Sequence, residues 1–186
     1  PLNRLTREQA NAVEQTLARR GTPMPVYVGM RHWPPRIAET VARMQADGIE
    51  EAAALVMAPH YSAMSIGRYR KKLDEAVQAS RSPIRFCFIE SWSDQPQFTR
   101  AWADALKPLL QPGVKVVFSA HSLPARIRQM NDPYEENLRA SASRIAKQAG
   151  VDDWMFAFQS AGATAEPWLG PAIEDVLPEL ARAGYQ

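Results

Sequence analysis

The stretch Val114-Lys115-Val116-Val117-Phe118-Ser119-Ala120-His121-Ser122-Leu123-Pro124 decides the fold of this chain. Its first five residues are β-branched or aromatic, apart from Lys115, which is typical of a buried parallel strand. His121 follows two small residues, and Pro124 prevents a simple continuation of the strand. Ligands of open α/β sheets bind at the carboxyl ends of strands, so His121 is the first candidate for chemistry. The alternative is a structural histidine that caps a strand end.

Strand and helix patterns alternate on both sides of this stretch. The other predicted strands are Pro25–Met30, Ala52–Met57, Ile84–Ile89 and Trp154–Phe158. Six helices are predicted. Five lie within Thr6–Arg20, Pro34–Gly48, Ser65–Ala79, Asp132–Gln148 and Pro171–Gly184, and the sixth begins after an N-terminal cap at Asp94. This order predicts βαβ crossovers and parallel sheets in two lobes, with three strands before residues 91–94 and two after. A cleft between the lobes would be lined by carboxyl ends of strands.

Composition limits the function classes. Lys+Arg 22 against Asp+Glu 20 gives a net charge of +2, which does not favour nucleic acid as a partner. The apolar runs are of strand length and no signal-peptide pattern is present, so a cytoplasmic protein is expected. Cys87 has no second cysteine to pair with and is expected in the core. The chain begins at Pro1 and ends at Gln186, just after a predicted helix, and is expected to be the core of a longer protein.

Polar residues gather at the predicted strand ends. They are Arg31, His32, His60, Glu90, Ser119, His121, Ser122, Gln159 and Ser160. All three histidines of the chain are among them, which favours one shared site that uses imidazole as a metal ligand or base. The sequence has no HExxH motif, nucleophile elbow or Gly-rich phosphate loop, which disfavours zinc hydrolases and nucleotide binding.

Several candidates have equally simple structural explanations. Trp33, Trp92 and Trp168 could stack on a planar ligand or pack within hydrophobic loops, and packing is favoured for the first two. Arg31 could bind a ligand carboxylate or form an ordinary surface ion pair. His60 could serve the site or hydrogen-bond within its own turn.

Taken together, the motifs resemble the ferrochelatase family. The residues that carry the resemblance are Gly29–Arg31, Ala58–Ser62, Glu90–Trp92, Phe118–Pro124, Asp132–Tyr134, Gln159–Ser160 and Pro167–Pro171. They occur in the family's order over the whole chain and are most similar to the bacterial branch that acts on coproporphyrin.

The resemblance implies the class II chelatase fold, with two Rossmann-like α/β lobes of parallel sheets and flanking helices. Residues 1–92 would form the N-terminal lobe without its first strand, and residues 93–186 the C-terminal lobe without its last segment. The implied reaction is insertion of ferrous iron into a porphyrin in haem biosynthesis, with coproporphyrin III favoured over protoporphyrin IX. Iron would be a substrate, no intrinsic cofactor is expected, and the protein would be a monomer.

The resemblance also implies roles for single residues. His121 would bind the metal or accept a pyrrole proton, and Trp168 would line the porphyrin pocket. Arg31, His60, Ser122 and Ser93 complete the expected substrate-binding set, with His60 on the side from which the metal arrives. Ser93 stands where close relatives carry a tyrosine that touches the porphyrin. The family's catalytic glutamate would follow the last helix, so this chain alone is expected to be poorly active.

The sequence is also compatible with three rival functions. One is a chelatase for another metal, such as cobalt, or another tetrapyrrole. Another is a non-catalytic module that binds porphyrin or haem. The third is a bilobal protein that binds an unrelated small ligand.

Overall fold

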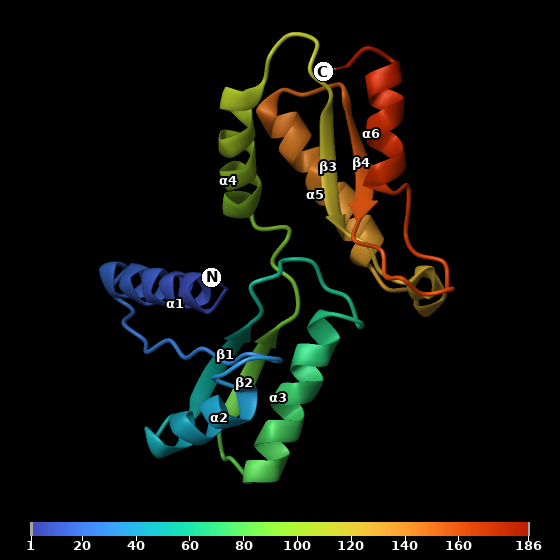
Figure 1. The fold of residues 1–186 in the computed structure, drawn as a ribbon. Helices are drawn as coiled ribbons and strands as arrows, with labels where there is room; N and C mark the ends of the chain where they lie inside the picture. Colours follow the sequence, from blue (N-terminus) through green and yellow to red (C-terminus); the bar gives the residue numbers. More distant parts are fainter. Residues whose placement is uncertain (1, 186) are drawn as a thin grey trace. The chain divides into compact units, whose positions relative to one another are not determined.

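The computed structural model describes residues 2–185 as a mixed α/β protein with parallel sheets flanked by helices (Figure 1). The chain forms two compact units. The first comprises Pro1–Leu55 with Arg68–Ile89, and the second comprises Val56–Gly67 with Glu90–Gln186. Residues 56–67 therefore belong with the second unit, while the expected lobe boundary at residues 92 and 93 stays a prediction.

The first unit is built on two parallel strands, β1 (Glu51–Leu55) and β2 (Arg85–Ile89). Its helices are α1 (Leu2–Arg19), α2 (Ile37–Ala46) and α3 (Ile66–Ser80), the last of which begins in the second unit. Buried Val41, Leu73 and Ala76 form the core, and Phe86 and Phe88 of β2 pack against it. The residues of β2 that face these helices therefore alternate along the strand, as the pleat of a strand requires.

The same alternation explains why the expectation for Cys87 is wrong. Cys87 lies between Phe86 and Phe88, so its side chain points to the opposite face of the sheet, and there it is exposed.

The predicted strand over Pro25–Met30 is also not formed. Only Met30 makes a bridge, to Arg36, and the rest of the segment has no regular structure. The Met30 amide donates to the Pro35 carbonyl at 2.8 Å, and the Thr40 hydroxyl donates to the Val28 carbonyl at 2.7 Å. The polar groups of this segment thus bond to the start of α2 instead of a strand ladder, which is why an apolar pattern alone gave the wrong element.

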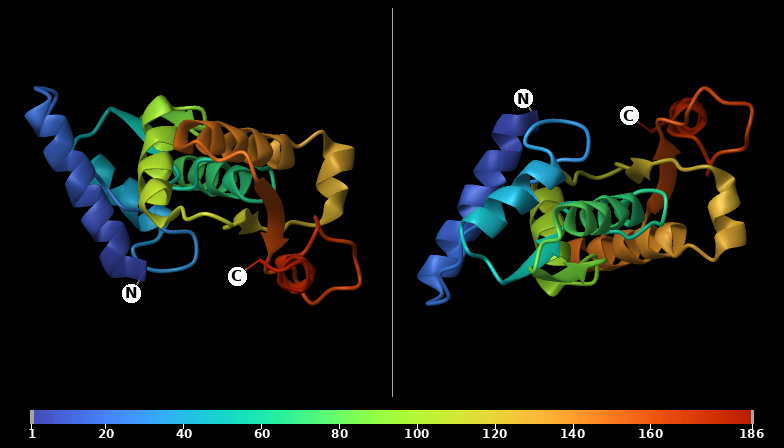
Figure 2. Two further views of the ribbon diagram at one scale, coloured as in Figure 1. Left: turned by 90° about the horizontal axis from the view of Figure 1, so that it is seen from above. Right: turned by 90° about the horizontal axis from the view of Figure 1, so that it is seen from below.

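The second unit has a parallel pair, β3 (Val116–His121) and β4 (Trp154–Gln159), in which His121 is opposite Gln159. Its helices are α4 (Pro96–Leu106), α5 (Tyr134–Ala149) and α6 (Ile173–Arg182), with short 3₁₀ helices η1 (Lys107–Leu109) and η2 (Ala125–Met130). Helix α5 packs against both α4 and β4, and α6 packs against β4 on another side (Figures 1 and 2). The predicted strand before His121 is confirmed, and it continues through His121 itself.

Local signals in the sequence set the ends of α5. The Asp132 carboxylate accepts a hydrogen bond from the Tyr134 amide at 3.1 Å, and so satisfies one amide of the first turn. Gly150 ends the helix at φ +77°, a left-handed conformation that glycine adopts without strain.

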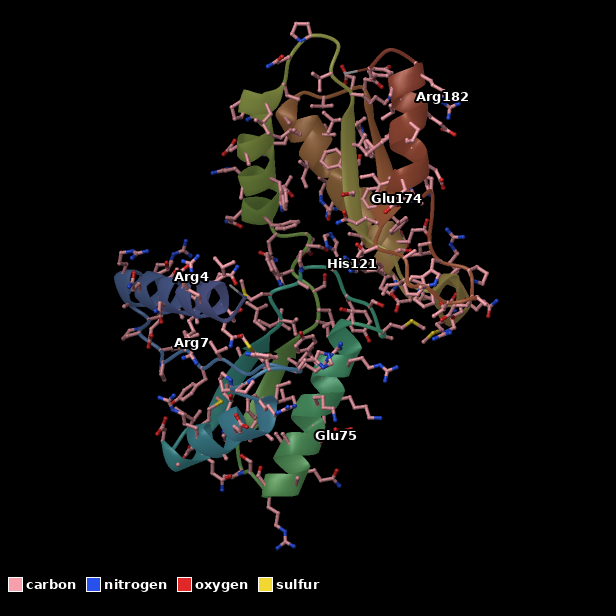
Figure 3. The ribbon with its side chains drawn as sticks, viewed as in Figure 1. Arg4, Arg7, Glu75, His121, Glu174 and Arg182 are labelled. Atoms are coloured by element: carbon pink, nitrogen blue, oxygen red, sulfur yellow. The ribbon has the colours of Figure 1, made fainter. Side chains whose placement is uncertain are left out.

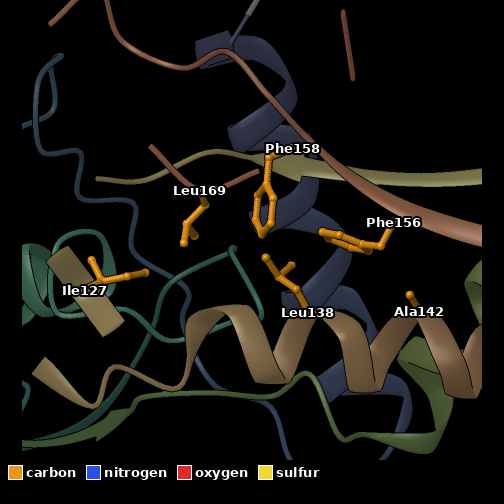
Figure 4. Close-up of a cluster of buried hydrophobic side chains, with 6 residues drawn as sticks. All are labelled: Ile127, Leu138, Ala142, Phe156, Phe158 and Leu169. Carbon is orange, nitrogen blue, oxygen red and sulfur yellow. The ribbon is translucent and has the colours of Figure 1, made fainter. Parts of the chain in front are cut away.

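The core of the second unit lies between β4, α5 and the segments around them (Figure 4). It contains Ile127, Leu138, Ala142, Phe156, Phe158 and Leu169. Phe156 and Phe158 meet edge to face with ring centroids 5.2 Å apart. Leu169 comes from the Pro167–Pro171 motif, so that motif is anchored in the core and is not a free loop.

Across the part of the chain that the structure describes, we find no helix with the length and apolar character that crossing a membrane demands.

Candidate active site

His121 is the last residue of β3, and its side chain is exposed (Figure 3). Among the described residues, no hydrogen bond or ion pair engages its imidazole. Its backbone, by contrast, is in the β3–β4 ladder, and its carbonyl accepts a hydrogen bond from the Tyr134 hydroxyl at 3.0 Å. A fixed backbone thus presents an imidazole whose nitrogens are available to a ligand.

The segment after His121 is fastened to the segment Pro167–Pro171, which we call the strap. The Ser122 hydroxyl donates to the Leu169 carbonyl at 2.8 Å, and the Leu169 amide donates to the Leu123 carbonyl at 2.9 Å. The Ala125 amide donates to the Pro167 carbonyl at 2.8 Å, and the Phe158 amide donates to the Pro171 carbonyl at 2.8 Å. These four bonds bring the strap, and Trp168 within it, beside the carboxyl end of β3.

Ser122 itself is 2% exposed, and its hydroxyl is used by the strap. Its expected role in binding substrate stays a prediction. In the structure, its hydroxyl holds the strap to the carboxyl end of β3.

Two residues that precede the strap hold the indole of Trp168. Its Nε1–H donates to the Thr164 hydroxyl at 2.9 Å. A Cβ added at Gly162 would lie 2.4 Å from Cζ2 of Trp168, so only glycine leaves room for the ring where it lies. The indole is therefore fixed at its nitrogen and along its benzene edge.

His60 and Ser93 form a second polar group around α5. His60 Nε2 lies 2.9 Å from the Ser141 hydroxyl, and the His60 ring meets Phe98 edge to face at 5.9 Å. The Arg144 guanidinium donates to the Ser93 carbonyl at 3.1 Å. Ser93 as a residue is 4% exposed. The expected binding roles of His60 and Ser93 stay predictions, and both residues are packed against α5.

Burial lowers the pKa of His60 from 6.5 to about 4, with a smaller contribution from the nearby Arg144 cation. The ring is therefore uncharged at neutral pH, which is the form that binds a metal. Its Nδ1 has no hydrogen-bond partner in the described part of the chain.

His121 and His60 are anchored at different points of α5. Tyr134, which bonds to His121, and Ser141, which bonds to His60, are separated along α5 by about 10 Å at the usual helical rise. Within residues 2–185, no three histidine, cysteine, aspartate or glutamate side chains gather to hold a metal.

Arg31 lies in the first unit. Its Nε donates to His32 Nε2 at 2.6 Å, and its guanidinium carbon lies 5.0 Å from the centroid of the Tyr69 ring. Its Nη1 is buried and has no hydrogen-bond partner among the described residues. A buried guanidinium nitrogen without an acceptor is costly, and a carboxylate ligand would satisfy it.

Sequence reasoning did not identify the residues that hold the site. Tyr134, Thr164 and Gly162 contact His121 or Trp168 across gaps of 4 to 13 residues, and Ser141 contacts His60 across 81. The sequence marks Asp132-Pro133-Tyr134 as a helix start and as one of the motifs shared with the family, but neither signal indicates that the Tyr134 hydroxyl reaches His121.

A sequence model of the family described as Ferrochelatase matches residues 1–186, the whole chain. The chain belongs to the ferrochelatase family. The resemblance seen in its motifs is thereby confirmed, and the α/β architecture with parallel sheets agrees with a fragment of the ferrochelatase fold.

Individual relatives of this ferrochelatase-family chain carry two names. A protein named ferrochelatase from Deinococcus radiodurans is 40% identical over 100% of this chain and 62% of its own length. Another ferrochelatase, from Herpetosiphon aurantiacus, is 40% identical over 99% of this chain and 63% of its own. A coproporphyrin III ferrochelatase from Bacillus subtilis is 36% identical over 100% of this chain and 63% of its own. The chain thus spans a little over three fifths of the length of these relatives.

Proposed function

We propose that this chain carries the histidine side of a ferrochelatase active site and takes part in inserting ferrous iron into a porphyrin for haem biosynthesis. The observation that supports this most is the exposed His121 imidazole, which has no hydrogen-bond partner in the described chain and lies beside the strap with Trp168. Membership of the ferrochelatase family supports the same reaction.

Porphyrin metallation needs the chemistry that an imidazole offers. Two pyrrole protons must leave the ring as the metal enters, and an imidazole nitrogen accepts a proton readily near neutral pH. Imidazole is also a good ligand for ferrous iron. One imidazole is a weak ligand set on its own, which suits a cation that must move on to the porphyrin.

Flat and cationic side chains suit the porphyrin itself. The indole of Trp168, fixed by Thr164 and Gly162, offers a rigid surface for a macrocycle to lie against. Arg31 offers a guanidinium nitrogen that needs an acceptor, and a porphyrin propionate would supply one.

We propose coproporphyrin III as the preferred porphyrin. Two observations support this proposal: some relatives are named coproporphyrin III ferrochelatase, and the sequence motifs are most similar to the bacterial branch that acts on coproporphyrin. Other relatives are named only ferrochelatase. The proposal is tested by comparing the two porphyrins directly, and a higher kcat/KM for protoporphyrin IX would overturn it.

The test of the reaction is metallation by the full-length protein, followed through porphyrin fluorescence with zinc as an air-stable substitute for ferrous iron. The wild-type protein should form the metalloporphyrin faster than buffer. His121→Ala should lower the rate at least 100-fold, because it removes the only group proposed to accept the proton or hold the metal, and should leave the porphyrin Kd within about three-fold. Normal turnover by this variant would contradict the role of His121. Tight porphyrin binding without any metallation by the wild type would instead indicate a binding module.

A further inference from the structure

We propose that Tyr134 is a positioning residue for His121. Its hydroxyl holds the backbone of His121, and through that backbone it sets the direction in which the imidazole points toward the metal and the porphyrin. This inference deepens the proposed ferrochelatase function and rests on it.

The direction of the His121 imidazole is not set by a hydrogen bond to the ring itself within residues 2–185. No side chain or carbonyl of the described residues hydrogen-bonds to the His121 ring, so its orientation depends on where its own backbone places it. A displacement of about 1 Å at a reacting group costs up to about 100-fold in rate. The hydrogen bonds to the His121 backbone therefore determine how accurately the imidazole is placed for the reaction.

Tyr134 supplies the bond to His121 on the side away from β4. The β3–β4 ladder pairs His121 with Gln159, and the Ser122 amide donates to the Gln159 carbonyl at 2.7 Å. The His121 carbonyl accepts from the Tyr134 hydroxyl at 3.0 Å, and among the described residues this is the one side-chain group bonded to the backbone of His121. Sheet and phenol together hold the residue from two sides.

Tyr134 is itself held by several contacts. It is the first residue of α5, its amide donates to Asp132, and its ring packs against the core cluster of the second unit. The other oxygen of Asp132 accepts from the Ala63 amide at 2.8 Å and from the Ser62 hydroxyl at 3.0 Å. The phenol thus connects His121 to a point where α5 and residues 62–63 are joined.

The hydroxyl also stays a donor over the working range of pH. Burial and the nearby Asp132 carboxylate raise the pKa of Tyr134, so the phenol remains protonated at and well above neutral pH. A carbonyl such as that of His121 accepts but cannot donate, so the protonated phenol is the state that makes this bond.

The test is Tyr134→Phe in the full-length protein, because phenylalanine keeps the packed ring and removes only the hydroxyl. We expect kcat for zinc insertion into coproporphyrin III to fall about 5- to 20-fold while KM for the porphyrin stays within about two-fold. The melting temperature should stay within about 3 °C of wild type, since one neutral hydrogen bond contributes little to the stability of a chain this long. A purely structural tyrosine would lower the melting temperature and the amount of folded protein without changing kcat per bound porphyrin.

The matched control is Tyr185→Phe. The Tyr185 hydroxyl also makes a hydrogen bond within the second unit, to Asp153 at 3.1 Å, but Asp153 precedes β4 and so lies at the end of the parallel pair opposite His121. Its kcat should equal that of wild type within about two-fold. Equal kcat for Tyr134→Phe and Tyr185→Phe would overturn the proposal.

A second measurement separates failure of this inference from failure of the proposed reaction. In NMR spectra of the His121 imidazole, Tyr134→Phe should broaden or shift the ring signals, and Tyr185→Phe should not. If the wild-type protein metallates no porphyrin, the proposed reaction fails, and the NMR comparison alone decides whether Tyr134 positions His121. Unchanged imidazole signals in Tyr134→Phe would overturn the inference in either case.

Discussion

At the scale of single residues, His60 is a histidine that its surroundings keep uncharged. Its ring is partly buried against Phe98 and Ser141 of α5, and burial together with Arg144 lowers its pKa to about 4. In the unfolded chain an imidazole titrates near its ordinary pKa of about 6.5. At a pH between these two pKa values, His60 is protonated in the unfolded state and unprotonated in the folded state.

This difference predicts how stability depends on pH. The folded pKa lies below the unfolded one, so the contribution of His60 is fully present above about pH 6.5 and is lost as pH falls toward 4. We expect the melting temperature to fall less steeply between pH 7 and about 4.5 in His60→Gln than in wild type. NMR of the native protein should place the His60 midpoint near pH 4.

Ser141→Ala is the control for the cause of the shift. Burial is the larger cause, so removal of the Ser141 hydroxyl should leave the His60 midpoint well below 6.5. A midpoint near 6.5 in the native wild-type protein would contradict the enclosure of the ring.

The sequence predicted residues at this scale when they follow from local position. His121 could be assigned to a strand end because residues 114–124 contain both the strand pattern and its stop. Tyr134 and Ser141 could not be assigned, since their roles depend on which atoms of distant segments the fold brings within 3.0 Å. Tertiary contacts of this kind leave no periodic pattern in the chain.

At the scale of elements, the strap carries an indole whose position depends on Gly162, a glycine that precedes the strap. The strap backbone is bonded to residues 122–125 and to Phe158, and the Trp168 indole covers Gly162. Gly162→Ala would place a Cβ 2.4 Å from the ring, closer than real carbon atoms approach, so the indole must move. We expect the Kd for coproporphyrin III to rise about 5- to 10-fold and the Trp168 indole N–H signal to shift in NMR spectra.

Gly170→Ala is the matched control for this prediction. A Cβ at Gly170 would meet only the Ala172 amide nitrogen at 3.7 Å, which is ordinary contact, so the indole signal should not move. If Gly162→Ala also leaves the indole signal and the porphyrin Kd unchanged, the ring is not fixed by this contact.

Elements were predictable where their signals are local in the sequence and were not predictable where they depend on a partner strand. Helix α5 begins within two residues of the predicted cap at Asp132 and ends at Gly150, because its caps are local. Pro25–Met30 has the composition of a strand, but its polar backbone groups bond to residues 35–40 instead. A strand is stable only when it pairs with a neighbouring strand, and the residues of the strand itself do not show which segment that neighbour is.

At the scale of the whole molecule, each compact unit has its own hydrophobic core. Val41 of α2 is 2% exposed in the first unit, and Val176 of α6 is 4% exposed in the second. Val→Ala at either position deletes the same two methyl groups from a similarly buried side chain and should cost about 2 kcal/mol. The two substitutions therefore form a matched pair that differs only in the unit it perturbs.

We expect the two units to open separately. Hydrogen exchange should show that Val41→Ala accelerates the slowest amides of β1 and β2 about 20- to 30-fold, the factor that 2 kcal/mol corresponds to, while amides of β3 and β4 change less than about two-fold. Val176→Ala should give the reverse pattern. The reason is that a cavity destabilises the cooperative segment that contains it, and the buried clusters of the two units share no residue.

Equal acceleration of all four strands by either substitution would mean that the chain opens as one cooperative structure. The pH dependence at His60 would then report the stability of both units, because the proton taken up on opening would be coupled to every amide of the chain. With separate opening, His60→Gln should change the pH dependence of exchange for β3 and β4 and leave that of β1 and β2 unaltered, since His60 belongs to the second unit. The independence of the units is therefore tested in two ways. The valine substitutions change the packing of one unit, and His60→Gln removes a group that becomes charged in the second unit.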